Sequence, residues 1–119
     1  MPARSTQMTI ENHTSQDLHG GSGGLVHGIW SEGVPETIPK GQSGTMRAES
    51  DGIMSGDQGY VYYKSAAGDM QFNFDNPFVG DNSYSTSVPD HFSVSKSGGA
   101  GNNCMLTWTI TEKLGHGHK

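Results

Sequence analysis

Apolar and polar side chains alternate along several short stretches of this chain. Met70, Phe72 and Phe74 fall on one face of an extended segment, and polar residues occupy the positions between them. A period of two residues is the signature of a strand that buries one face. The alternation is clearest between residues 104 and 110. Taken along the chain, the pattern predicts strands over residues 6–11, 25–30, 42–50, 60–63, 70–75, 91–95 and 104–110.

The arrangement of these stretches predicts the fold class. No window of useful length has the periodicity of a helix, and turn residues separate the stretches every ~8–12 positions. We therefore expect an all-β fold, an antiparallel β-sandwich or barrel, in one domain over residues 1–119 with 113–119 as a tail. The run Gly20–Gly24 is expected to be a flexible loop, and 34–41 an edge or crossover segment. The predicted core comprises Val61, Phe72, Phe74, Leu106, Trp108 and Ile110.

One loop carries unusual side chains. After the strand that ends near Asp75, two sets of turn residues enclose Phe78 and Val79, and Tyr84 follows. Loops normally lie on the surface and are polar. Either these rings fold back into a small core of their own, or they are presented to an apolar partner outside the protein. The sequence leaves both alternatives open.

The net charge, the single cysteine and the N-terminal residues limit the binding partners, the disulfide bonds and the location that we expect. The formal net charge is −5, so we expect neither a nucleic-acid partner nor a purely electrostatic attachment to an anionic membrane. The single cysteine, Cys104, cannot form an intrachain disulfide and is expected to be a small buried hydrophobe. Residues 1–8 lack the apolar region of a signal peptide. We expect a protein held in the cytoplasm or an inclusion body of its producing cell, then released.

Candidate catalytic and metal-binding residues are few. The six histidines are scattered, without the close pairing that a zinc site requires. Glu49 and Asp51 could pair as an acid and a base, but they flank a turn and are expected to cap it or face water. We therefore predict no enzyme activity, no metal and no cofactor. Among the aromatic residues, Trp30, Phe78 and Tyr84 lie in or beside loops and are the candidates for recognition.

Five segments of the chain form a distinctive series: AESDGIMSGDQG, YVYY, FNFDNPFVGDNSY, SGGAGNN and the closing GHK. In their order and spacing they resemble the aegerolysin family. Within that family, the similarity is greatest to the small component of bacterial two-part insecticidal crystal toxins. The resemblance implies a β-sandwich of the aegerolysin or actinoporin-like type that recognises membrane sphingolipids, with or without sterol. It also implies a larger, separately encoded pore-forming partner.

The resemblance also implies which residues contact lipid. Phe74 and Phe78 occupy the two tryptophan positions of the family motif Trp-Asp-Cys-Pro-Trp-Gly, and Tyr84 stands near another aromatic position. Glu49 or Asp51 could supply the acidic group that lies near the headgroup in some relatives. The prediction is a non-enzymatic, lipid-binding subunit of a pore-forming toxin that also self-associates. A lectin-like module that reads sugars is the alternative, and a small hydrolase using Glu49 and Asp51 is a third.

Overall fold

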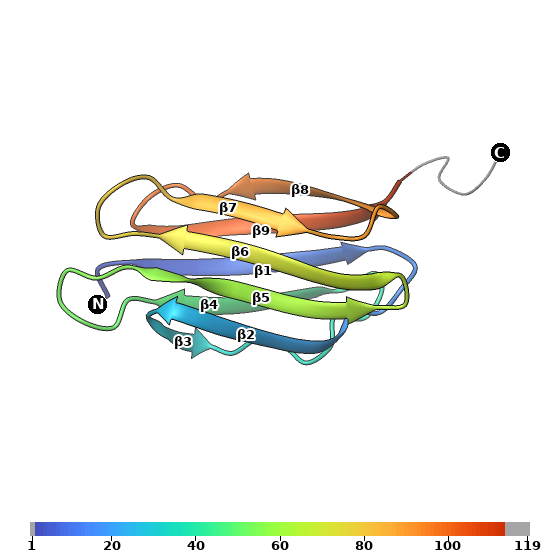
Figure 1. Cartoon of the computed structure of the whole chain (residues 1–119), viewed down its shortest axis with the longest axis horizontal. Coiled ribbons are helices and arrows are strands. Elements are labelled where there is room, and N and C mark those ends of the chain that lie inside the picture. The colour runs from blue at the N-terminus through green and yellow to red at the C-terminus, as the bar shows by residue number, and fades with distance from the viewer. Residues whose placement is uncertain (1, 114–119) are drawn as a thin grey trace.

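The computed structural model describes residues 2–113, and all its regular elements there are strands (Figure 1). Beyond Lys113, the predicted tail lies outside the described residues. The strands are β1 (Ser5–His13), β2 (His19–His27), β3 (Ile29–Glu32), β4 (Ser43–Glu49), β5 (Asp57–Ser65), β6 (Gly68–Asn76), β7 (Ser83–Ser87), β8 (Phe92–Gly98) and β9 (Asn103–Glu112).

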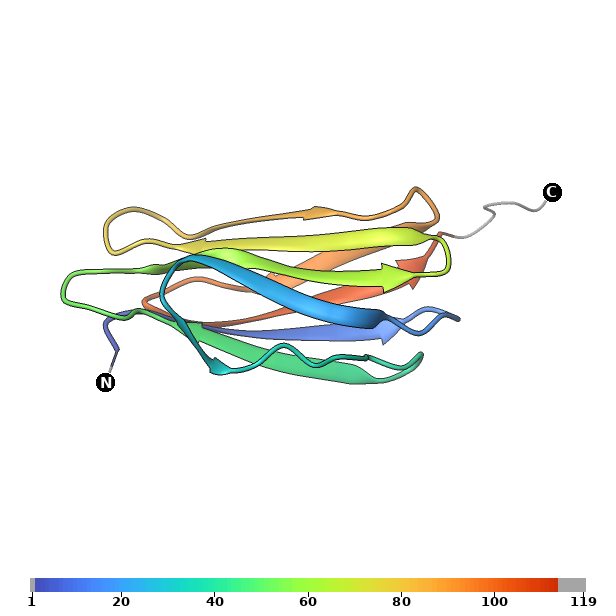
Figure 2. The ribbon, with the colours of Figure 1, turned by 60° about the horizontal axis from the view of Figure 1, so that its bottom comes forward.

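The strands form two sheets that lie face to face (Figures 1 and 2). One sheet has the order β3-β4-β1-β9-β8 and the other has the order β2-β5-β6-β7. This confirms the predicted all-β sandwich. All pairs are antiparallel except β1 with β9, which is parallel. Alternation along one strand says which face is buried but not which strand lies beside it, so the sequence could not reveal this pair.

The core lies between the sheets and confirms the prediction. All six residues expected there are buried, with exposed fractions of 0–3%. The Trp108 and Phe72 rings, one from each sheet, lie 5.2 Å apart between centroids. Side chains from both inner faces therefore interdigitate, as in other sandwiches.

The glycine-rich run expected to be a flexible loop belongs instead to strand β2. The reason is close packing. A Cβ atom on Gly21 would lie 2.1 Å from the carbonyl oxygen of Pro35, and one on Gly23 would lie 2.6 Å from the Trp30 ring. These glycines let neighbouring groups approach the strand backbone.

The stretch 25–30 contains two strands rather than one. The break is Gly28, whose φ of +102° is readily adopted only by glycine. A Cβ there would lie 2.5 Å from the carbonyl oxygen of Glu49. At this corner the chain passes from β2 in one sheet to β3 in the other. The segment 34–41 then connects β3 to β4, its neighbour in the same sheet, and its buried Ile38 forms a bridge with Leu18.

One end of the sandwich, called the loop end below, gathers four segments. These are the loops 50–56, 77–82 and 99–102 together with residues 2–4, all at the left in Figures 1 and 2. The loops are in contact at their bases, because a Cβ on Gly56 would lie 2.3 Å from the carbonyl oxygen of Asn76.

Candidate functional site

The loop end carries most of the exposed large apolar side chains. Seven such side chains are exposed in the described part of the chain. Three of them lie on these loops, and two more lie on β2 and β3 where these strands pair next to the loop 50–56. We call these five the apolar rim: Val26, Ile29, Ile53, Met54 and Val79. Ile53 is 93% exposed and Val79 is 83% exposed. Single exposed apolar residues are ordinary, but several gathered on one end of a small protein usually mark a binding surface.

The loop 50–56 is folded so that its two apolar residues point outward. The Ser55 hydroxyl donates to the carbonyl oxygen of Gly52 at 2.8 Å, which closes a tight turn around Ile53 and Met54. Met54 has a φ of +54°, a left-handed conformation that costs a non-glycine residue about 1 kcal/mol or more. The sequence showed a turn here, but not that the apolar pair would form its tip.

Phe78 and Tyr84 are both half-buried. The Arg4 guanidinium covers the Phe78 ring, with Cζ 4.6 Å from the ring centroid. The Tyr84 ring packs edge-on against Trp108 at 6.2 Å, and its hydroxyl donates to the carbonyl oxygen of Gly99 at 2.8 Å. Burial raises the pKa of Tyr84 well above its usual value. In this loop, Val79 is therefore the large apolar side chain that is exposed to solvent.

Trp30 and Phe74 form an aromatic pair at the edge of the core. Their ring centroids are 5.9 Å apart in an edge-to-face arrangement. Phe74 is 2% exposed, as its strand alternation predicts, so it does not reach the surface position that the family resemblance assigns to it. Trp30 is half-buried beside Phe74. The pair connects β3 of one sheet with β6 of the other.

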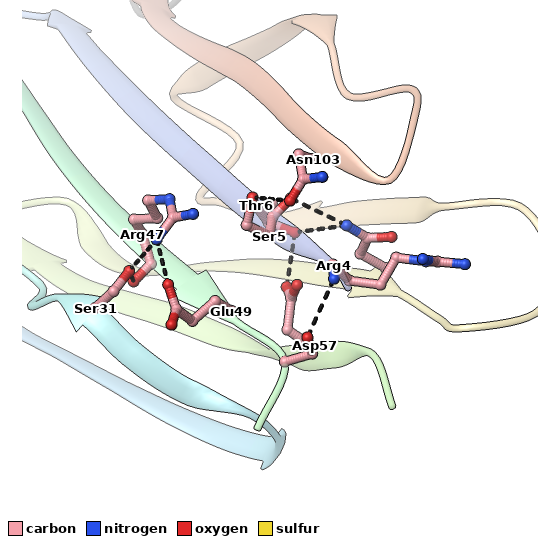
Figure 3. Close-up of polar contacts among 10 residues, drawn as sticks. Arg4, Ser5, Thr6, Ser31, Arg47, Glu49, Asp57 and Asn103 are labelled. Atoms are coloured by element: carbon pink, nitrogen blue, oxygen red, sulfur yellow. Dashed lines mark hydrogen bonds and ion pairs between the residues drawn. The ribbon is translucent and has the colours of Figure 1, made fainter. Parts of the chain in front are cut away.

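Glu49 and Asp51 also lie at the loop end. The Glu49 carboxylate accepts a hydrogen bond from Arg47, which also donates to Ser31 (Figure 3). Asp51 is exposed. Both carboxylates line a groove of about 530 Å³ beside Ile29 and Ile53. They are thus next to the apolar rim, with Glu49 already neutralised by a cation.

A second hollow lies on the outer face of the four-stranded sheet, beside Val26 of the apolar rim. It has a volume of about 360 Å³. Its lining includes Val26, Gln58, Tyr60, Asn73, Asp75 and Ser85. One aromatic face, two amides and a carboxylate converge there, the mixture that fixes a small polar ligand in orientation. Sequence alternation predicted that Asn73 and Asp75 face outward. It did not predict that residues of β2 and β7 would line the two sides of a hollow around them.

A buried polar network closes the core behind the loops. Asp57 is fully buried, and the Thr6 hydroxyl donates to its Oδ1 at 2.6 Å (Figure 3). Its Oδ2 has no hydrogen-bond partner. Asn76 donates to Thr6 Oγ1 at 3.3 Å, and the Cys104 thiol lies 3.7 Å from the same oxygen. Cys104 is buried as predicted, but among polar groups, and burial raises the pKa of Asp57 to about 6.

Two further findings concern the described residues 2–113. They contain no group of three or more His, Cys, Asp or Glu residues placed to hold a metal ion. They also contain no helix long and apolar enough to cross a bilayer.

Comparison with known proteins extends these observations. No protein-family model matches the chain. An uncharacterized protein of Dictyostelium discoideum is 32% identical over 113 residues, which is 92% of this chain but only 10% of that protein. The chain thus spans about a tenth of the length of this relative. Among solved structures, the lipid binding protein Nakanori superposes with a TM-score of 0.78 at 13% identity, over 95% of this chain and 73% of that one. This protein therefore shares the two-sheet fold of Nakanori.

Proposed function

We propose that this protein is a non-enzymatic module that binds lipid membranes through its loop end. The observation that carries the proposal is the apolar rim, five exposed apolar side chains at one end of the sandwich. The shared fold with a lipid binding protein supports it. Transfer of apolar side chains from water to the edge of a bilayer is favourable for the same reason that core burial is.

The apolar rim alone gives weak affinity. Full burial of Ile53, Met54 and Val79 would contribute roughly 5–9 kcal/mol at about 1.5–3 each. Association costs about 4 kcal/mol or more in lost freedom. The remainder, about 5 kcal/mol at most, corresponds to a Kd of about 0.2 mM at best. Selectivity for one lipid must therefore come from polar contacts to a headgroup.

The hollow beside Val26 is the proposed headgroup site. Tyr60 offers a ring, and Asn73 and Asp75 offer an amide and a carboxylate. The resemblance to aegerolysins supports a sphingolipid, with or without sterol, as the lipid. The same resemblance supports a larger pore-forming partner, self-association and action at the membrane of a target cell after release from the producing cell.

A lectin-like module is the second candidate, and the same hollow favours it. Sugars stack on aromatic rings and bond to amide and carboxylate groups, and Tyr60 lies beside both kinds of group there. In that case the apolar rim would contribute nothing to binding, and a soluble saccharide would displace the protein.

Sedimentation with vesicles tests the proposal. The vesicles contain phosphatidylcholine, sphingomyelin and cholesterol, and the variant Ile53→Ser/Met54→Ser is compared with the wild type. Met105→Ser is the control, since Met105 is 66% exposed, close to the 69% of Met54, but lies on the outer face of the five-stranded sheet rather than on a loop tip. We expect the double variant to lose at least tenfold in binding and the control to keep it. Equal vesicle binding by all three proteins would reject the loop end as the membrane-binding surface. No vesicle binding by the wild type, or displacement by free saccharide, would reject the membrane function.

A further inference from the structure

Arg4 connects two loops of the loop end. Its backbone N–H donates to Ser50 Oγ at 3.1 Å, and its carbonyl oxygen accepts from the Ser50 N–H at 2.9 Å. Its side chain extends the other way, toward the loop 77–82 (Figure 3). There Nε donates to the carbonyl oxygen of Pro77 at 3.1 Å and Nη2 donates to that of Phe78. Nη1 donates to the carbonyl oxygen of Ala3 at 2.8 Å.

The partners of this guanidinium are all neutral. They are three carbonyl oxygens and the face of the Phe78 ring. The ion pairs formed within residues 2–113 are His13 with Glu11 and Arg47 with Glu49, and neither includes Arg4. Arg4 thus carries a full charge without an anionic partner, in a chain whose formal net charge is −5.

The position of this cation matters more than its charge alone. Arg4 contacts the base of each loop that carries an exposed apolar tip, Ile53 on one side and Val79 on the other. If those tips enter a bilayer, the guanidinium comes to the level of the headgroups, where long basic side chains are usually found in membrane-bound proteins.

We propose that Arg4 binds the phosphate of a lipid headgroup when the loop end docks on a membrane, as a second lipid contact outside the hollow beside Val26. This inference rests on the membrane-binding function proposed above. A guanidinium fits two phosphate oxygens at once, and hydrogen bonds between charged groups are roughly twice as strong as those to neutral acceptors. Phosphate therefore displaces the Pro77 and Phe78 carbonyl groups. The exchange uncovers the Phe78 ring, which then follows Val79 into the bilayer.

Two lipids that share a ceramide tail separate phosphate recognition from other contacts. Vesicles of digalactosyldiacylglycerol, which has no phosphate, carry either sphingomyelin or galactosylceramide. Wild type, Arg4→Gln, Arg4→Lys and the control Lys113→Gln are compared by sedimentation. Lys113→Gln removes the same charge, but from a residue at the far end of strand β9. Thermal unfolding of each variant verifies that it is folded.

We expect Arg4→Gln to lose about tenfold in binding to sphingomyelin vesicles and nothing on galactosylceramide vesicles. Arg4→Lys keeps the charge but not the planar guanidinium, so its binding to sphingomyelin vesicles should lie between that of the wild type and that of Arg4→Gln. Lys113→Gln should bind both kinds of vesicle as well as the wild type does. Equal binding of Arg4→Gln and wild type to sphingomyelin overturns the inference while leaving the membrane function intact. An equal loss of binding by Arg4→Gln to both kinds of vesicle also overturns the inference, because Arg4 would then act only by holding the loops in their conformation.

Hydrogen exchange separates a lipid phosphate from a free one. Sphingomyelin vesicles should change the exchange of the amides in residues 77–82 in the wild type but not in Arg4→Gln. Inorganic phosphate alone should leave it unchanged, because a free ion brings no bilayer for the loop tips to enter. A similar change with inorganic phosphate would identify a free-anion site and reject the lipid assignment. A wild type that binds neither vesicle would reject the membrane function and this inference with it.

Discussion

The buried carboxyl group of Asp57 makes stability depend on pH. Asp57 is fully buried at the start of β5, and one of its oxygens has no hydrogen-bond partner. Burial is the largest influence on its pKa and raises it from 3.8 to about 6. The Thr6 hydroxyl and Arg47 lower the pKa by smaller amounts, while Asp75 and Glu49 raise it.

The sign and size of the effect follow from proton linkage. A raised pKa means that the folded state binds the proton more tightly than the unfolded state. The stabilisation of the folded state by the protonated Asp57 carboxyl group is fully present below pH ~4. It is lost as the pH rises through about 6, and at higher pH the stability no longer changes because of this group. A shift from 3.8 to about 6 corresponds to about 3 kcal/mol at about 1.4 per pKa unit.

Asp57→Asn tests this reasoning. The asparagine side chain keeps an oxygen that accepts the hydrogen bond from the Thr6 hydroxyl, but it cannot ionise. The part of the pH dependence of stability that is due to Asp57 therefore disappears. We expect the free energy of unfolding of the wild type, measured by urea denaturation, to fall by about 2.5 kcal/mol more than that of Asp57→Asn between pH 4 and pH 7.5. Asp51→Asn is the control, because Asp51 is exposed in the adjacent loop. Parallel curves for wild type and Asp57→Asn would refute the account of a buried, unpaired carboxylate.

Other substitutions separate packing from recognition by their effects on stability. Gly21→Ala should lower the free energy of unfolding, measured by urea denaturation, by about 1–3 kcal/mol or more, because its Cβ would lie 2.1 Å from the backbone oxygen of Pro35. Gly33→Ala is the control and should change it little, because no atom lies within 4 Å of the added Cβ. Phe72→Ala should cost about 3–5 kcal/mol, since the ring is fully buried, and a cost below 1 would contradict the packing described here. Ile53→Ser should change the thermal midpoint by no more than a degree or two, because a residue that is 93% exposed contributes within about 0.5 kcal/mol.

The sequence predicted the strands well wherever one face is buried. In β6 and β9 the alternation follows directly from burial, so both the strands and their inward residues could be identified. Strand β2 could not be recognised, because its glycines serve close approach and leave no alternation to read. The parallel pairing of β1 with β9 depends on tertiary arrangement, which local pattern does not contain.

The site was predicted only in outline. Turn residues and the family resemblance directed attention to Glu49, Asp51 and Phe78, which do lie at the loop end. They did not reveal that Ile53 forms the exposed tip of its loop, because burial at a turn is decided by the shape of the turn. Nor did they reveal that Arg4 links two loops, because Ser50, Pro77 and Phe78 lie more than 40 positions away from it in the chain.

The adjacency of β1 and β9 has a consequence for biogenesis. The central strand of the larger sheet, β1, hydrogen-bonds along its whole length to β9, the strand most distant from it in the described sequence. Until β9 has emerged from the ribosome, the growing polypeptide has a gap in the middle of this sheet and an exposed apolar face. We expect the sheet to close only after β9 has been synthesised, at the slow rates typical of proteins dominated by contacts between distant segments. Chaperone occupancy on the nascent polypeptide should accordingly persist until β9 has emerged.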